Sequence, residues 1–282
     1  NTAVGKDAMG AVTTATVDAA VAIGFQALYG SSSTTAASSG AVAIGREALK
    51  SVTTGDTNIG IGSQALMSIT TGSGNVAIGH GSLDVCTIGD DNVSIGKYAF
   101  GALDSSDNND DNVAIGGVAM YNTTDSIASI GIGYSAGRYH TNTSTNLTGQ
   151  VTDCILIGKM AMASSNTPTN QVVIGKEAVG QGDNTVTLGN AATTAVYMSD
   201  DSAAHVYCGD ITIGGSKGLY GFSSRLFMWT DTNGTFIRST DNDATNGIHF
   251  QNYAGTEIVT FLDSGKVGIG TAAPYLGLHI KS

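Results

Sequence analysis

Val76-Ala77-Ile78-Gly79 is the stretch that decides the fold, because close copies of it recur down the first two thirds of the chain. Self-similarity at a short period is the signature of a stacked repeat, in which each copy is one coil of a solenoid. Degenerate copies end at Gly5 and Gly189, and we call all eleven of these glycines the repeat glycines. The nine full copies end at Ile23 and Gly24, Ile44 and Gly45, Ile61 and Gly62, Ile78 and Gly79, Ile95 and Gly96, Ile115 and Gly116, Ile132 and Gly133, Ile157 and Gly158, and Ile174 and Gly175.

The spacing of the repeat glycines indicates coils of a favoured length with occasional additions. Successive separations are 19, 21, 17, 17, 17, 20, 17, 25, 17 and 14 residues. Because 17 recurs and most longer steps add polar residues, the excess is expected to bulge out as surface loops. Loops carry function more often than the scaffold does. The variable stretches 31–40, 104–111, 139–150 and 163–170 are therefore the predicted receptor contacts.

Each coil has a finer internal pattern. A β-branched residue stands three places before the repeat glycine, Ile stands one place before it, and the residue between is usually small. Period-2 alternation puts the branched pair on one face of a strand. We expect that face to fill the coil interior and the small face to allow another backbone to approach. The glycine is expected to make a turn, followed by a second short strand with a small and an apolar residue, as in Ala65-Leu66.

One such coil buries little apolar surface. Ordering the backbone costs roughly 1–2 kcal/mol per residue, whereas each of a few apolar side chains recovers roughly 1.5–3 kcal/mol. A coil therefore needs neighbours above, below and beside it. We infer lateral association, most simply a homotrimer with closed threefold symmetry.

Composition narrows the class of protein. Of 282 residues only 12% are charged and the net charge is −11, which argues against nucleic acid and anionic membranes as partners, since phosphates are bound by Lys and Arg. No apolar run approaches the ~20 residues of a membrane span, and no signal peptide is seen. The chain starts in mid-repeat, as expected of a fragment or processed piece. Cys86, Cys154 and Cys208 lack metal-ligand spacing and are expected to be buried free thiols.

Three regions follow from these patterns: a repeat array over 1–190, a transition over 191–215 and a small antiparallel β unit over 216–282. Strands are still expected at 195–198 and 210–214 within the transition. The last region holds alternating apolar runs and two hairpin turns, at 231–234 and 263–265. Its predicted strands are 225–229, 235–238, 247–250 and 257–261.

The repeat resembles the head of trimeric autotransporter adhesins, on the strength of Asn75-Val76-Ala77-Ile78-Gly79 and the copies that begin at Asn92 and Asn112. That resemblance implies a left-handed parallel β-roll in a homotrimer. The longer 17-residue unit, as in Gly62-Ser63-Gln64-Ala65-Leu66 followed by Thr70-Thr71-Gly72, looks like those of phage and giant-virus tail fibres. Residues 265–280 resemble the segment before the intramolecular chaperone of endosialidase-type fibres. The resemblance implies a virion or, alternatively, a bacterial cell surface as the location.

Candidate chemistry is sparse. The Asp-rich insertion 104–111 offers oxygen ligands for Ca²⁺ but lacks the EF-hand pattern, and it is expected to be a solvated loop, as are the pairs at 90–91 and 200–201. The five histidines share no spacing, no Gly-rich run has the phosphate-loop pattern and no nucleophile elbow is present. The sequence thus predicts no catalytic, cofactor-binding or metal site. The histidines are His80, His140, His205, His249 and His279.

The leading hypothesis is a non-enzymatic homotrimeric fibre that attaches to an unidentified receptor, glycan or protein, on a host surface. Three equivalent faces would give avidity. One alternative is the head of a bacterial trimeric autotransporter adhesin that binds matrix or host proteins. Another is a glycan-cleaving tailspike with carboxylate pairs on its β-helix. An ice-binding solenoid ranks last, because the Thr residues cluster in variable linkers.

Overall fold

The computed structural model describes residues 1–11, 17–30, 39–102, 109–141, 145–193 and 196, and the strand segments 229–231, 234–236, 247–251, 257–262, 266–269 and 278–280. Over these residues the chain is all-β and contains no helix. It divides into two compact units, Asn1–Tyr197 and Met198–Ser282.

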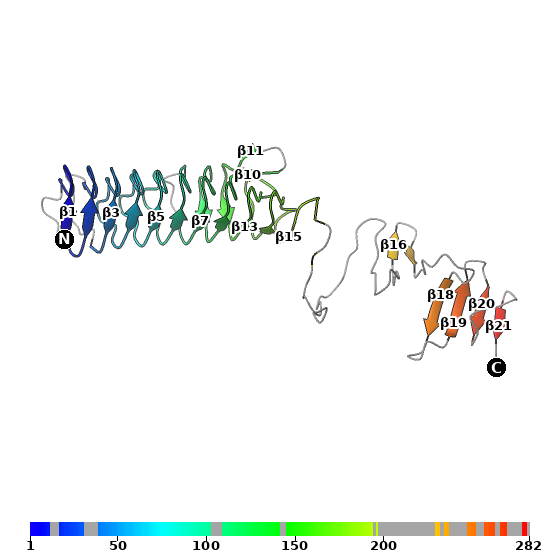
Figure 1. Ribbon diagram of the computed structural model, residues 1–282. Helices are drawn as coiled ribbons and strands as arrows, with labels where there is room; N and C mark the ends of the chain where they lie inside the picture. The colour runs from blue at the N-terminus through cyan, green and yellow to red at the C-terminus, as the bar shows by residue number, and fades with distance from the viewer. Residues whose placement is uncertain are drawn as a thin grey trace. The chain divides into compact units, whose positions relative to one another are not determined.

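The first unit is a parallel β-solenoid, as the repeat predicts (Figure 1). Each coil contributes one three-residue strand to an 11-stranded parallel sheet, and each strand pairs in register with the equivalent strand of the next coil. For example, Val76 pairs with Val93 and Ile78 with Ile95. The strands are β1 (Thr2–Val4), β2 (Val21–Ile23), β3 (Val42–Ile44), β4 (Ile59–Ile61), β5 (Val76–Ile78), β6 (Val93–Ile95), β7 (Val113–Ile115), β9 (Ile130–Ile132), β13 (Ile155–Ile157), β14 (Val172–Ile174) and β15 (Val186–Leu188).

The repeat glycine ends each strand for two physical reasons. Gly79 has φ of +134°, in a region that side-chain-bearing residues rarely adopt. A Cβ at this position would also lie 2.6 Å from the carbonyl oxygen of Gly96 in the next coil. The glycines therefore stack directly on one another, and the turn predicted from the sequence is confirmed.

The segment after the glycine is a tight arc, so the prediction of a second strand in every coil is wrong. In the first eight coils the residues two and four places after the glycine adopt left-handed conformations, as at Gln64 (φ 63°) and Leu66 (φ 52°), whereas Met162 and Val179 of the later coils form an isolated parallel bridge. In the left-handed conformation the backbone N–H groups of the residues two and four places after the glycine point to the preceding and to the following coil, respectively. Gln64 donates to the Arg46 carbonyl of the preceding coil at 2.8 Å, and Leu66 donates to the Ser82 carbonyl of the following coil at 3.0 Å. The coils are thus hydrogen-bonded along the arc without an extended strand.

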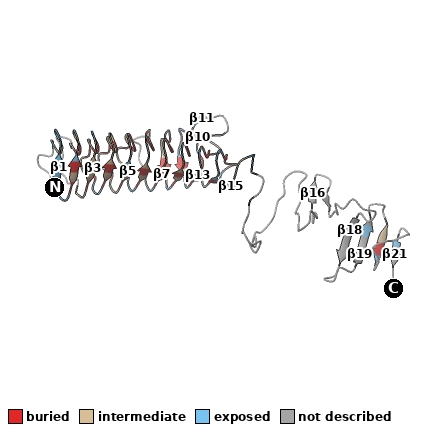
Figure 2. Ribbon diagram, viewed as in Figure 1, coloured by how far each residue is buried: buried red, intermediate tan, exposed pale blue. Residues whose placement is uncertain are grey.

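The core is a narrow column that runs through the stacked coils. It is filled by the small middle residue of each strand and by the Ala and larger apolar residue of each arc, which are buried (Figure 2). The largest fully buried side chains of the arcs are Leu28, Leu49, Leu66, Leu83, Phe100 and Met120.

A buried ladder of asparagines closes the corner before the strands. The Oδ1 atom of Asn58 accepts hydrogen bonds from the backbone N–H and the Nδ2 of Asn75, at 3.0 and 3.1 Å. Asn92 repeats these contacts on Asn75, and Asn112 repeats them on Asn92. The Nδ2 of Asn75 also donates to the Gly89 carbonyl at 2.7 Å. Each amide therefore satisfies backbone groups that the corner would otherwise bury unpaired.

Four short strands belong to the coils around the longest insertion. β12 (Val151–Thr152) pairs in parallel with β8 (Ser126–Ile127), whereas β10 (Tyr139–His140) and β11 (Thr145–Asn146) form an antiparallel pair that projects from the stack (Figure 1).

The second unit contains a two-stranded and a four-stranded sheet. β16 (Trp229–Asp231) pairs antiparallel with β17 (Gly234–Phe236), on either side of the first predicted hairpin turn. The four-stranded sheet has the order β18 (Gly247–Gln251), β19 (Glu257–Leu262), β20 (Val267–Ile269) and β21 (Leu278–Ile280). Its first two pairings are antiparallel and its last is parallel, because the chain enters β21 at the same end as β20. The sheet is therefore mixed, whereas the sequence predicted a purely antiparallel unit. Of the strands expected in the transition, only Val196 falls within the described residues.

Candidate assembly surface

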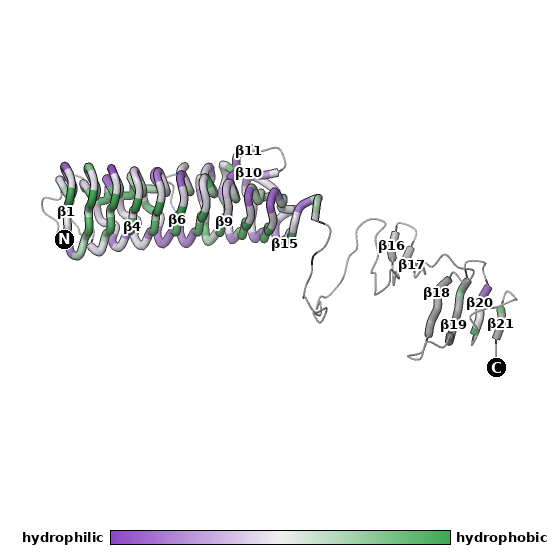
Figure 3. The backbone as a smooth tube through the Cα atoms, in the orientation of Figure 1, coloured by the Kyte–Doolittle hydropathy of each residue, from purple (hydrophilic) through white to green (hydrophobic). Residues whose placement is uncertain are grey.

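The outward face of the 11-stranded sheet is the main apolar surface of the solenoid. On each strand the first and third residues point away from the core, so the sheet carries two parallel lines of Val, Ile and Leu, with Thr2 at the start of one line, which we call the outer rows. Along the described coils these side chains are half-buried or exposed, and Ile23, Ile78 and Ile174 are between 37% and 39% exposed. Figure 3 shows hydrophobic colour on strand after strand of the stack.

This arrangement overturns the predicted division of labour within the strand. The branched residues were expected inside and the small residue outside, but Ala77 is fully buried while Ile78 is exposed. The reason is volume: the arc already places a large side chain in the column. A Cβ on Gly131 would lie 2.5 Å from Cγ of Met120, and one on Gly60 would lie 3.3 Å from Cγ of Leu49. Only Gly, Ala or Ser fits opposite such side chains. In the C-terminal coils Leu156 and Val173 take this place, and Leu156 lies opposite Gly137 of the preceding arc, where a Cβ would lie 3.1 Å from Cδ1 of Leu156.

The outer rows form a strip long enough to bind another protein. Neighbouring strands lie about 4.8 Å apart, so eleven strands extend over about 50 Å. The strip is about 10 Å wide, since each strand has three residues at about 3.3 Å. An apolar patch of roughly 500 Å² is comparable to the largest patch of a typical monomeric protein, and such patches are often functional. The nine Ile-Gly pairs of the repeat supply eighteen predicted structural positions. Each Ile lies in an outer row, and each Gly directly follows a strand.

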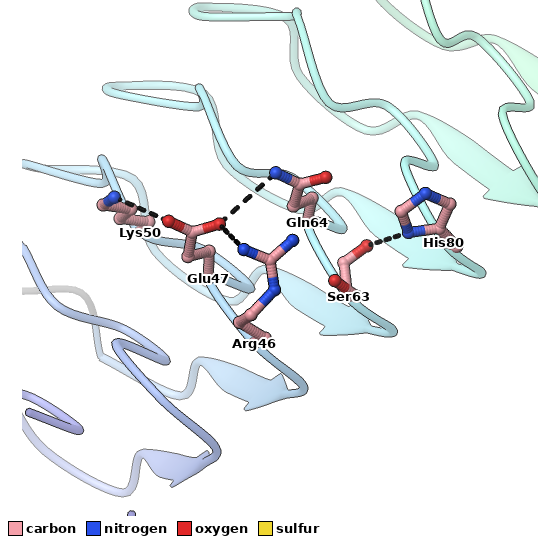
Figure 4. A network of polar contacts seen from close by, with 6 residues as sticks. All are labelled: Arg46, Glu47, Lys50, Ser63, Gln64 and His80. Atoms are coloured by element: carbon pink, nitrogen blue, oxygen red, sulfur yellow. Dashed lines mark hydrogen bonds and ion pairs between the residues drawn. The ribbon is translucent and has the colours of Figure 1, made fainter. Parts of the chain in front are cut away.

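A second surface runs along the arcs and is polar. On the arc after β3, Glu47 accepts hydrogen bonds from Arg46 and Lys50 at 2.9 Å, and from Gln64 of the next arc at 3.3 Å (Figure 4). These contacts, with the Lys50 bond as the largest cause, lower the pKa of Glu47. His80 continues the line, with Nδ1 3.1 Å from the Ser63 carbonyl and Nε2 3.0 Å from the Tyr98 hydroxyl.

Further along the arcs the line becomes aromatic. Tyr98 meets Tyr121 edge to face with ring centroids 6.1 Å apart, and the Arg138 guanidinium lies 5.3 Å from the Tyr121 centroid. Each of these tyrosines covers a glycine of the preceding coil: a Cβ on Gly81 would lie 2.5 Å from the Tyr98 ring. This pairing was not predicted from the sequence, although a Gly one coil before a Tyr was the available signal.

The length of the coils varies at equivalent places in the sequence. The stretches 12–16, 31–38, 103–108 and 142–144 each begin seven or nine places after a repeat glycine, and all four lie outside the described residues. Of the predicted receptor loops, 163–170 is described throughout, whereas 31–40, 104–111 and 139–150 lie partly outside the described residues.

The remaining sequence candidates are scattered. His80 and His140 lie apart, while His205 and the side chains of His249 and His279 fall outside the description. Within the described part of the chain, no three His, Cys, Asp or Glu side chains gather as a metal site would require. Asp90 and Asp91 are exposed, as predicted; Asp110, at the end of the acidic insertion, accepts a hydrogen bond from the Asp90 N–H at 2.8 Å.

The described cysteines are free and buried, as predicted, and Cys208 lies outside the described residues. Burial raises the pKa of both the Cys86 and the Cys154 thiols. These side chains behave as small core residues. As for membrane spans, the described segments hold no helix with the length and apolarity to cross a bilayer.

Comparison with protein-family models, with curated proteins and with solved structures found no match for this chain. The function is therefore argued from the surfaces described above.

Proposed function

We propose that this chain is a non-enzymatic fibre that assembles as a homotrimer and attaches to a host cell surface, as part of a virion tail fibre. The observation that carries the proposal is the uncovered apolar strip of the outer rows. A solenoid that stands alone gains nothing from two lines of mostly Val and Ile on its outside. Covering them with copies of the same chain removes apolar area from water, at about 25 cal/mol per Å².

The regular architecture supports a role in attachment. Stacked coils with a constant sheet make a long scaffold, and the insertions at equivalent places in the sequence give each copy a set of variable loops. Three copies would present three such rows, so individually weak contacts with a receptor would add up through avidity. The receptor would be a surface glycan or protein that the loops recognise.

The first test is the mass of the full chain in solution by light scattering. We expect about three times the chain mass of 28.4 kDa. A variant with Ile61→Ser, Ile78→Ser and Ile95→Ser should dissociate, because it breaks the strip at three neighbouring strands. Val85→Ser is the matched control, since this side chain is also exposed but lies outside the sheet. A stable wild-type monomer would overturn the proposal.

The second test addresses attachment. Labelled trimer should be retained by the surface of intact host cells in a saturable manner, and shortening the stretch 31–38 and the stretch 142–144 should lower retention without changing the mass. If shortening these stretches left retention unchanged, the proposed role of the variable loops in binding would be contradicted.

A further inference from the structure

The strip of outer rows has two long borders of opposite charge. Every basic residue of the described solenoid stands one or five places after a repeat glycine, and five of the seven stand directly after it. These five exposed side chains, at the border where the strands end, we call the basic border. They are Lys6, Arg46, Lys97, Lys159 and Lys176.

The opposite border is acidic. The two positions that lie five and six residues before a repeat glycine hold eight Asp and no Lys or Arg, whereas the position directly after the glycine holds no Asp or Glu. These eight residues, which we call the acidic border, are exposed except for the half-buried Asp110. They are Asp18, Asp56, Asp90, Asp91, Asp110, Asp111, Asp153 and Asp183.

The topology keeps the two borders apart. All eleven strands run in the same direction, so the residues before them line one long edge of the sheet and the residues after them line the other. The ion pairs within the described residues use Glu47 and Glu177 of the arcs and leave the acidic border out. Where charges of one sign fall on consecutive coils, as at Lys159 and Lys176 or at Asp91 and Asp111, they repel one another at a spacing of about 5 Å, which a partner of opposite charge would relieve.

We infer that the partner of this strip is a second copy of the chain, aligned parallel and in register, whose acidic border meets the basic border of the first. This inference rests on the proposed homotrimer and specifies how the copies pair. Rotation about the solenoid axis brings a basic border against an acidic one. If instead two copies packed face to face with their solenoid axes antiparallel, related by a twofold axis parallel to the strands, basic border would meet basic border and acidic border would meet acidic border.

Two strands define the register. β6 has Asp91 before it and Lys97 after it, and β13 has Asp153 before it and Lys159 after it. In a threefold ring of parallel copies, each strand level is shared by all three chains. Lys97 of one copy then meets Asp91 of the next, and Lys159 meets Asp153. Each trimer holds these two pairs at each of its three contacts.

Charge reversal tests the pairing in the full chain. We expect the basic variant, Lys97→Glu with Lys159→Glu, and the acidic variant, Asp91→Lys with Asp153→Lys, each to weaken trimer association by about tenfold or more at low salt. High salt should reduce both effects, since exposed charges are screened. Asp111→Lys is the matched control: its φ of 59° resembles the 55° of Asp91, but the residue at the other end of its strand level is Gly117.

The combined variant, with all four reversals, should recover the trimer because every contact is again between opposite charges. A mixture of the basic and acidic variants should not recover it, because a ring of three must contain at least one contact between like borders. Masses from sedimentation velocity read out both results, and circular dichroism checks that each variant keeps its β structure.

Three outcomes would overturn the inference. If the reversals leave the mass unchanged, the borders do not pair, although the homotrimer stands. If the combined variant stays dissociated while the control is intact, the register is wrong. If the mixture assembles as well as the combined variant, the copies associate in pairs. A wild-type monomer would instead overturn the proposed function itself.

Discussion

The two faces of the same three-residue strands carry opposite kinds of residue. The inner face of the N-terminal coils holds Ala, Gly or Ser packed against large side chains of the arc, and the outer face holds Val and Ile in contact with solvent. In an ordinary half-buried sheet the large residues would be inside. The reversal shows that one coil is too narrow for two large side chains, so the large residues of the strand lie on the outward surface of the solenoid.

The largest loss of stability is expected where the backbones of neighbouring coils are in contact, at the repeat glycines. Gly79→Ala should lower the free energy of unfolding by about 2–6 kcal/mol, since strain at positive φ and overpacking each contribute about 1–3 kcal/mol. Gly182→Ala separates the two terms: its φ is +144°, but no atom lies within 4 Å of the added Cβ. Urea unfolding followed by circular dichroism measures both, and equal losses would show that the stacking contact is unimportant.

The second largest loss of stability is expected when a large arc side chain that packs against the inner face of the strands is removed. Leu66→Ala should cost about 2–5 kcal/mol, because it opens a cavity beside the small inner residues that cannot fill it. Leu66 is fully buried, whereas its neighbour Met67 is partly exposed, so Met67→Ala should cost less than about 1 kcal/mol. The same unfolding measurement compares them, and similar midpoints would place the core elsewhere.

The asparagine ladder sets the corner that leads into both faces. Asn75→Ala should destabilise the chain by about 1–3 kcal/mol, because the N–H of Asn92 and the carbonyl of Gly89 lose their buried partner. Thr71→Ala is a suitable control, since that side chain is exposed and its backbone is not in the left-handed region. Amide hydrogen exchange around β4, β5 and β6 should be faster in Asn75→Ala than in the unsubstituted chain. Unchanged exchange there would contradict the ladder's role.

The smallest expected effect concerns Asp84 on the arc. Burial raises its pKa, and one carboxylate oxygen has no hydrogen-bond partner. Since the folded state holds the proton more tightly than the unfolded state, Asp84 favours folding most below its unfolded pKa and loses that contribution as pH rises through the folded pKa. Asp84→Asn should therefore stabilise the chain slightly near neutral pH. The gain should vanish in acid, and a gain that grows in acid would contradict this assignment.

Much of the fold could be predicted from the repeat alone. The Ile-Gly spacing fixed the coils, the parallel strands and the strained glycine, because stacked glycine corners leave a period in the sequence. The orientation of Ala77 and Ile78 could not be derived, since alternation says only that they face opposite ways. The side that is inside depends on Leu66 and its equivalents, whose left-handed backbone has no sequence signature.

The candidate surface was predictable only in part. The sequence suggested lateral association but assigned it to the small residues, because the volume of the coil interior is a tertiary property. The charged borders depend on which residues flank a strand, so they became visible only after strand bounds were known. The parallel pairing of β20 and β21 likewise depends on the path between them, which local patterns do not specify.

The most direct test of the central claim is the labelling rate of single cysteines by a maleimide on the assembled full chain. Ile78→Cys lies in an outer row and Val85→Cys lies on the arc; the native side chains are 37% and 41% exposed in the isolated chain. After subtraction of the label taken up by the unsubstituted chain, we predict that Ile78→Cys reacts far more slowly than Val85→Cys. Equal rates would show that the outer rows face solvent and that no copy covers them.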